Sequence, residues 1–257
     1  MVTKYLHMNY KIEGSGETLV FIHGLSDNLM YWEYLASNLK DEYQVLRVEL
    51  RGHGESELGS DEITIGTYVN DLNNLLEELN ISKVNLVGFS LGGLVAMDFA
   101  IRHSQKVDSL VLMSSFCKVD DVLYEVLCQF KEALSISFEE FFDLILPMVL
   151  CPEVIEDNKE ELMLLRQIAS QTANTEAYIK AVEACMDFNV EDDLAKIDIP
   201  TLILAGKYDE ISRLDMQIDL QRKIRNSKLI VFEDSKHNLL VGKNNEKILN
   251  IMKKENK

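Results

Sequence analysis

The amino-acid sequence predicts an α/β protein with a doubly wound, mostly parallel sheet and a helical lid insertion. Two observations predict this class. Short apolar runs rich in β-branched residues alternate with segments of helical periodicity, which is typical of parallel strands joined by helices. The alternation stops over residues 119–195, where helical patterns continue without a convincing strand. We therefore expect residues 1–118 and 196–257 to form the core, and residues 119–195 to form the lid.

The expected strands are almost continuously apolar, which indicates that helices cover both faces of the sheet. They are Thr18–Ile22, Gln44–Leu50, Val84–Phe89, Val107–Met113, Thr201–Ala205 and Leu229–Phe232. Helical periodicity marks the segments between them. These expected helices are Tyr31–Leu39, Tyr68–Leu79, Leu91–Arg102, Leu214–Ile224 and Asn245–Met252.

The lid segment contains its own helix signals. Ser137 followed by Glu140 has the spacing of a capping box and precedes an apolar stripe. Pro147 and Pro152 then punctuate the segment. Two further helices are expected at 159–171 and 175–186. Because ligands of open α/β sheets bind at the carboxyl ends of the strands, we expect the lid to cover that edge.

Composition excludes several classes of function. The chain has 43 acidic and 26 basic residues, a formal charge of −17, which argues against binding to nucleic acid or to anionic lipid. No apolar stretch approaches the roughly 20 residues of a membrane span, and no signal peptide is evident. The four cysteines are scattered, without the spacing of a metal site or disulfide framework. We expect a cytoplasmic protein without metal or other cofactor that acts on a small molecule; the sequence carries no signal for an oligomeric state.

The strongest local signal is Gly88-Phe89-Ser90-Leu91-Gly92, which follows an expected strand and opens an expected helix. A serine on such a sharp turn has a strained backbone, and side chains at Gly88 and Gly92 would collide with it. The turn would hold the Ser90 hydroxyl above the sheet edge. The Leu91 amide at the start of the helix would favour a negatively charged oxygen. The alternative is a glycine-rich strand-helix junction with an incidental serine.

A nucleophilic serine on this kind of turn is followed along the chain by its acid and then by its histidine base. Only His103 and His237 follow Ser90. His103 stands about 20 Å further along the helix that starts at Ser90, by helical rise, and cannot reach the hydroxyl. His237 lies in a polar loop after the last expected strand and is the predicted base; the alternative is a surface histidine.

The acid is expected after a strand and before His237, and Asp209 meets both conditions. It would hold the imidazole tautomer and stabilise the imidazolium. The nearest rival is Glu210, and Asp234 is close in sequence to the histidine. Asp120 or Asp121 offers a less common location for the acid.

A second amide donor toward a negative oxygen is expected from His23-Gly24-Leu25, which ends the first expected strand. The Leu25 amide is the candidate. His23 itself precedes the serine and is assigned a structural role in shaping the turn.

Taken together, these residues resemble the α/β-hydrolase superfamily, and in particular its lidded carboxylesterases, enol-lactonases and C–C-bond hydrolases. The resemblance covers nearly the whole chain. It rests on Leu19-Val20-Phe21-Ile22-His23-Gly24 with Trp32, Arg51-Gly52-His53-Gly54-Glu55-Ser56, Gly88-Phe89-Ser90-Leu91-Gly92-Gly93, Pro200 to Gly206 leading to Asp209, and His237. It implies a catalytic triad of Ser90, Asp209 and His237, with Leu25 and Leu91 forming the oxyanion hole. Glu49 departs from the aspartate usual in relatives, but the turn that it precedes looks structural in the family.

The expected function is hydrolysis of a small carboxylic ester through an acyl-enzyme. Trp32, Phe138 and Phe142 are the candidates for substrate contact, together with the lid stripe of Phe141, Ile145 and Leu146; ordinary packing of the lid is the alternative. The same triad could open an enol lactone, cleave a C–C bond beside a ketone, or hydrolyse the methyl ester of a pimeloyl carrier. The lid has few basic residues to hold a substrate carboxylate, which ranks these below simple esters. A small-molecule receptor on a hydrolase fold is the alternative outside enzymes.

Overall fold

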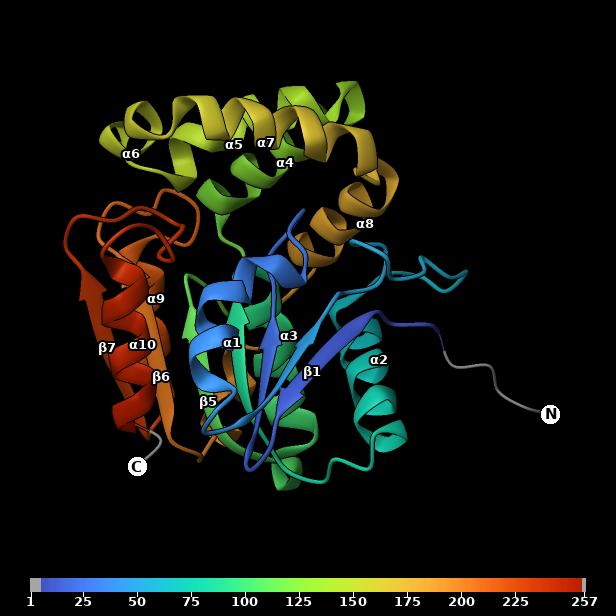
Figure 1. The fold of residues 1–257 in the computed structure, drawn as a ribbon, viewed down its shortest axis with the longest axis vertical. Coiled ribbons are helices and arrows are strands. Elements are labelled where there is room, and N and C mark those ends of the chain that lie inside the picture. Colours follow the sequence, from blue (N-terminus) through green and yellow to red (C-terminus); the bar gives the residue numbers. More distant parts are fainter. Residues whose placement is uncertain (1–5, 256–257) are drawn as a thin grey trace.

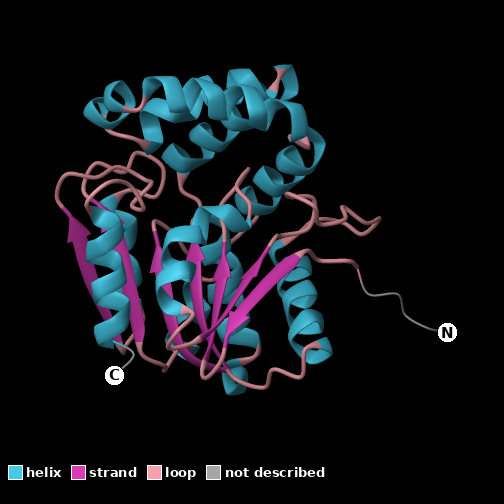
Figure 2. Ribbon diagram, in the orientation of Figure 1, coloured by secondary structure: helices cyan, strands magenta, loops and turns pink. Residues whose placement is uncertain are grey.

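The computed structural model describes residues 6–255, which fold around one seven-stranded sheet (Figures 1 and 2). The strand order is β1-β3-β2-β4-β5-β6-β7, and every pair is parallel except β1 with β3. The strands are β1 (Tyr10–Gly14), β2 (Thr18–Ile22), β3 (Gln44–Val48), β4 (Val84–Phe89), β5 (Val107–Met113), β6 (Thr201–Gly206) and β7 (Ser227–Phe232). The predicted doubly wound, mostly parallel sheet is therefore confirmed.

Strand β1 is not among the expected strands; it pairs antiparallel with β3 at the edge of the sheet. Its five residues are mostly exposed, so it lacks the continuous apolar run that marked the other strands. It is held by its backbone ladder and by an ion pair from Glu13 to the buried Arg47 of β3, at 2.7 Å. An edge strand covered on neither face gives only a weak hydrophobic signal.

Helices cover both faces of the sheet and create two apolar clusters. Helices α2 (Ile65–Glu78), α3 (Leu91–Arg102) and α9 (Leu214–Lys223) contribute to the cluster on one face. Helices α1 (Glu33–Leu39) and α10 (Asn244–Glu255) pack on the other face. Short 3₁₀ helices span Leu29–Trp32, Ser104–Lys106 and Glu191–Lys196. The five helices expected for this core are all present, with boundaries within a few residues.

Residues 119–195, predicted as a lid, form five helices without a strand of the sheet. They are α4 (Asp121–Ile136), α5 (Phe138–Val149), α6 (Pro152–Asp157), α7 (Lys159–Thr172) and α8 (Thr175–Met186). Figure 1 shows α4 to α8 stacked beyond the end of the sheet toward which the parallel strands point. Ser137 caps α5 by accepting a hydrogen bond from the Glu140 amide at 3.1 Å. Pro147 lies within α5 and does not end it.

Between residues 6 and 255, no helix is both long enough and apolar enough to cross a membrane.

Candidate active site

Ser90 occupies a strained turn between β4 and α3, with a φ angle of 51°. The two flanking glycines have no room for a side chain. A Cβ atom on Gly88 would lie 2.3 Å from the carbonyl oxygen of Gly92, and one on Gly92 would lie 2.1 Å from the carbonyl oxygen of Ile22. The turn therefore requires glycine at both positions, as the steric argument from the sequence predicts.

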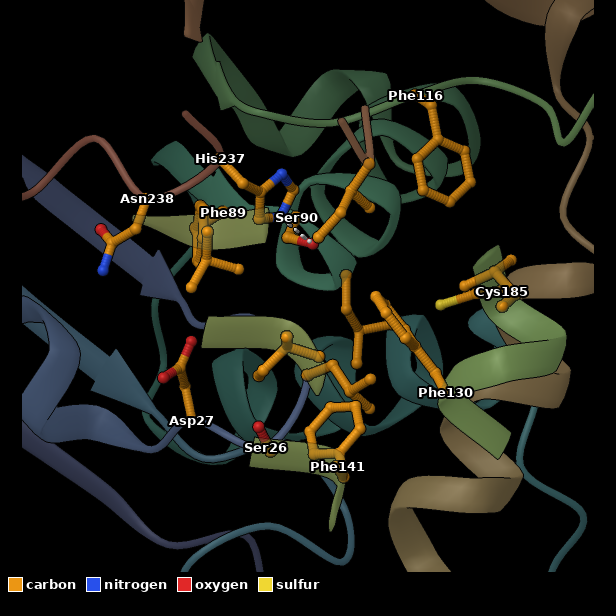
Figure 3. Close-up of a pocket in the computed structure, with 16 residues that line it drawn as sticks. Ser26, Asp27, Phe89, Ser90, Phe116, Phe130, Phe141, Cys185, His237 and Asn238 are labelled. Carbon is orange, nitrogen blue, oxygen red and sulfur yellow. Dashed lines mark hydrogen bonds between the residues drawn. The ribbon is translucent and has the colours of Figure 1, made fainter. Parts of the chain in front are cut away.

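The structure brings Ser90, His237 and Asp209 together at the carboxyl ends of β4, β7 and β6. The Nε2 atom of His237 lies 3.0 Å from the Ser90 Oγ atom (Figure 3). The Nδ1 atom of the same ring lies 2.8 Å from Oδ2 of Asp209. Both His237 and Asp209 are buried. An imidazole held between a hydroxyl and a carboxylate can accept the hydroxyl proton and be stabilised while it carries that proton.

The Asp209 carboxylate is itself held by three hydrogen bonds. Oδ1 accepts from the amides of Ile211 and Ser212 at 2.9 and 3.0 Å, and Oδ2 accepts from the Ser212 hydroxyl at 2.8 Å. Ser212 was missed in the sequence analysis, although a hydroxyl three residues after a turn aspartate is a common partner of that aspartate.

The rival acids lie elsewhere. Glu210 is exposed and pairs with Lys236, while Asp234 is exposed and pairs with Lys243. Asp120 caps α4 by accepting from the Leu123 amide at 2.9 Å, and it also pairs with Arg213. The exposed Asp121 lies in the first turn of α4. Of these acids and Asp209, only Asp209 contacts the His237 ring in the described structure.

Leu25 and Leu91 line the cavity beside Ser90. Leu91 is the first residue of α3, where backbone amides have no partner within the helix. Within residues 6–255, neither the Leu25 amide nor the Leu91 amide donates a hydrogen bond to another residue. Both amides are therefore available to a ligand oxygen.

Both ring nitrogens of His23 form hydrogen bonds with backbone atoms near this site. Its Nδ1 atom lies 2.7 Å from the carbonyl oxygen of Gly24, to which it donates, and its Nε2 atom accepts from the Leu50 amide at 3.0 Å. Burial lowers the pKa of His23 to about 4, so the ring is neutral at pH 7. These contacts fit the structural role expected for His23. His103 follows the last residue of α3 and contacts Phe99, away from the site.

A cavity of about 120 Å³ opens onto Ser90. Its wall is mostly apolar and combines the core with α4, α5 and α8, contributed by Phe89, Phe116, Leu127, Phe130, Phe141, Ile145, Val149, Cys185 and Ile211 among others. Of the lid stripe, Phe141 and Ile145, one turn apart on α5, line the cavity, whereas Leu146 does not. The cavity wall is therefore formed by both parts of the chain.

The three residues singled out for substrate contact do not line this cavity. Trp32 is fully buried, with its ring 4.9 Å from that of Phe21 and 4.8 Å from that of Tyr31. It belongs to the apolar cluster between the sheet and α1. Phe138 packs against Phe141 and Phe142, with ring centres 6.1 and 6.2 Å apart, and neither Phe138 nor Phe142 lines the cavity. Those two fit the alternative reading, packing within the helices α4 to α8.

Asp27 is a cavity residue that the sequence analysis missed. It lies two residues after Leu25 and lines the same cavity. Burial raises the pKa of its carboxyl to about 7. The available signal was a carboxylate placed just after the predicted amide donor. Nothing in its spacing from Ser90 or His237 pointed to it.

No group of three or more metal-binding side chains is found within the described part of the chain. The site consists of a serine, a histidine and a carboxylate above a parallel sheet, with two free amides nearby. This arrangement defines the class as an α/β protein with the residues of a nucleophilic hydrolase.

Comparison with known proteins agrees with that class. Residues 17–143 match the family model described as the alpha/beta hydrolase fold. The 3-oxoadipate enol-lactonase 2 of Acinetobacter baylyi is 26% identical over 231 residues, covering 89% of this chain and 85% of that protein. The solved esterase of Exiguobacterium antarcticum superposes with a TM-score of 0.87 at 24% identity, covering 96% of this chain and 94% of that one. The chain belongs to the α/β-hydrolase superfamily.

A third relative, an uncharacterized protein of Mycobacterium tuberculosis, is 38% identical over 113 residues. The match covers 44% of this chain and 33% of that protein, so this chain spans about a third of the length of that relative.

Proposed function

We propose that the protein is a serine hydrolase that cleaves a small carboxylic ester through an acyl-enzyme. The observation that carries this proposal is the continuous chain of contacts from the Ser90 hydroxyl through His237 to Asp209, with separations of 3.0 and 2.8 Å. The similarity to an esterase and to an enol-lactonase agrees with a hydrolase of ester bonds.

In the first half of the reaction, Nε2 of His237 takes the Ser90 proton as Oγ bonds to the ester carbonyl carbon. The carbonyl oxygen becomes negative and accepts hydrogen bonds from the Leu25 and Leu91 amides. The bond from that carbon to the leaving oxygen then breaks, and the imidazolium gives its proton to the departing alcohol. Asp209 stabilises the imidazolium without taking its proton.

In the second half, His237 takes a proton from water as the water oxygen bonds to the acyl carbon. The bond to Ser90 Oγ breaks, the proton returns to Oγ, and a carboxylic acid leaves. The mostly apolar wall of the small cavity favours a short acyl or alcohol group. In this proposal the helices α4 to α8 act as a lid over the site.

An enol-lactonase is the second candidate, because the Acinetobacter baylyi relative has that activity by name. A lactone is a cyclic ester and would be opened by the same steps. No lysine or arginine is among the residues that line the cavity in the described structure, which weakens the case for a lactone bearing a carboxylate.

The test combines a fluorophosphonate probe with hydrolysis of p-nitrophenyl esters of increasing acyl length. We expect labelling at Ser90 alone, and a loss of kcat/KM of several orders of magnitude in Ser90→Ala. The control is Ser104→Ala, an exposed serine after α3, which should keep wild-type activity. Near wild-type activity in Ser90→Ala would overturn the mechanism, and absence of both labelling and hydrolysis would favour a receptor.

A further inference from the structure

Asp27 places a carboxyl group in a cavity wall that is otherwise mostly apolar. Figure 3 shows its carboxylate pointing into the cavity, toward the side where Phe89 and His237 lie. The polar neighbours in the wall, Ser26 and Asn238, carry no charge. No lysine or arginine forms an ion pair with Asp27 within the described residues.

The reaction itself does not use this carboxylate. It makes no hydrogen bond to Ser90 or His237, and Asp209 already occupies the Nδ1 side of the imidazole. A backbone hydrogen bond at Gly24 lowers the pKa of this carboxyl by less than burial raises it, so the charged carboxylate destabilises the folded protein here. A carboxylate that lines the cavity, destabilises the fold and takes no part in the reaction is a candidate for ligand recognition.

We propose that Asp27 is a specificity-determining residue that selects esters bearing a cationic ammonium group and rejects esters bearing a second carboxylate. The inference rests on the proposed ester hydrolysis. Its physical basis is the low dielectric of the cavity, where attraction to a cation and repulsion of an anion are both stronger than in water. Because no lysine or arginine lines the cavity in the described structure, no permanent positive charge compensates the repulsion of an anionic substrate.

The test uses pairs of esters that match in shape and differ in charge. Acetylcholine is compared with 3,3-dimethylbutyl acetate, in which carbon replaces the ammonium nitrogen. Monomethyl glutarate is compared with methyl 4-carbamoylbutanoate, in which a neutral amide replaces the carboxylate. Acid release at constant pH gives kcat/KM for each ester. For an ester that is not turned over, its inhibition constant against p-nitrophenyl acetate gives the same comparison.

In the wild type at pH 8 we expect kcat/KM of the cationic ester to exceed that of its neutral match at least tenfold. We expect kcat/KM of the anionic ester to fall at least tenfold below that of its match. Asp27→Asn keeps the shape of the side chain and removes its charge, so both ratios should move toward one. Asp41→Asn, which removes an exposed carboxylate outside the cavity, should leave both ratios unchanged.

A second measurement needs no variant. Burial raises the pKa of Asp27 to about 7, and the titratable groups that interact with it are His237, Tyr31 and Tyr178. Burial also raises the pKa of both tyrosines above 10, so they stay neutral. The preference for the cationic ester should therefore rise between about pH 6 and pH 8.

The outcomes separate the two proposals. Absence of hydrolysis of every neutral ester, together with absence of fluorophosphonate labelling at Ser90, would remove the proposed function. Hydrolysis of neutral esters with ratios that are unaffected by Asp27→Asn and flat with pH would overturn the role of Asp27 alone. An equal loss of activity on all four esters in Asp27→Asn would also overturn it.

Discussion

The hydroxyl of Ser212 donates a hydrogen bond to the Oδ2 atom of Asp209, the same oxygen that lies 2.8 Å from Nδ1 of His237. One oxygen therefore accepts from both the imidazole and a neighbouring hydroxyl. Two backbone amides hold the other oxygen, Oδ1. The carboxylate has little freedom to rotate, so its orientation toward His237 is fixed before any substrate binds.

Replacing Asp209 by asparagine should lower kcat/KM by about 10³ to 10⁴, because an amide cannot hold the same tautomer or stabilise the imidazolium. The matched control is Glu210→Gln, whose exposed carboxylate pairs with Lys236 and does not contact the imidazole in the described structure. That variant should remain within a few-fold of wild type in p-nitrophenyl ester assays. A larger loss in Glu210→Gln than in Asp209→Asn would transfer the role of the acid to Glu210.

Ser212→Ala should have a smaller effect, about 10-fold to 100-fold in kcat/KM, since it removes one of the three donors that hold the carboxylate besides the imidazole. Ser212→Thr keeps a hydroxyl and should restore most of the activity. Thermal melting separates positioning from stability: if the alanine variant lost activity only in proportion to its unfolded fraction at the assay temperature, Ser212 would be a structural residue.

Much of the fold was predictable because the central strands are buried on both faces. Strands β4 and β5 and helix α3 matched their expected bounds, and the turn between β4 and α3 has a steric requirement that is visible in the sequence as two glycines. The exposed edge strand β1 has no such signature. A sequence pattern therefore predicts a strand or a turn where burial or a local steric requirement determines that structure.

The residues of the candidate site likewise divide into those that the sequence predicts and those that it does not. Ser90, His237 and Asp209 could be named because each follows a strand, and parallel strands bring their carboxyl ends to one edge. Which side chains of α5 face the cavity depends on the orientation of this helix relative to the core. No local sequence pattern determines that orientation. Phe141 lines the cavity, whereas Phe142 beside it does not.

Gly92→Ala should abolish folding or activity, because its Cβ atom would lie 2.1 Å from a backbone oxygen of β2 that cannot move aside. Gly66→Ala provides the contrast near the start of α2, where the nearest atom is 3.4 Å away on the flexible Arg102 side chain. Alanine there should be neutral or stabilising by about 0.5 kcal/mol. Soluble yield, circular dichroism and ester hydrolysis of the two variants would check this. A folded and fully active Gly92→Ala protein would contradict the geometry of the turn.

Phe141→Leu should widen the cavity and shift the preferred p-nitrophenyl ester toward longer acyl chains. The ring of Phe141 is almost fully buried, 5.5 Å from that of Phe130, and both rings line the cavity. Phe142→Leu is the matched control on the next residue of α5, outside the lining. The measurement is the ratio of kcat/KM for octanoate to that for acetate. Equal ratios in the two variants would show that the wall at Phe141 does not limit acyl length.

Asp27→Asn should stabilise the protein at alkaline pH and leave its stability almost unchanged at acid pH. The carboxyl pKa is raised from 3.8 to about 7 in the folded protein, so the folded state binds its proton more tightly than the unfolded state. Stability is therefore lost as pH rises from about 4 to 7, as the unfolded state releases this proton first. Asparagine has no proton to lose. We expect the difference in unfolding free energy between variant and wild type to grow from near zero at pH 4.5 to about 1 to 2 kcal/mol at pH 8, a figure reduced for the partial access of water to the cavity.

Urea unfolding of both proteins across this pH range measures the difference directly. The buried His23 and His53, whose pKa values are lowered to about 4 and about 3, destabilise both proteins as pH falls and so cancel in the comparison. Asp41→Asn, at an exposed position, should show no such pH-dependent gain. A gain from Asp27→Asn that is equal at pH 4.5 and pH 8 would mean that burial does not raise the pKa of the Asp27 carboxyl. The expected rise in preference for the cationic ester between pH 6 and pH 8 would then have no physical basis.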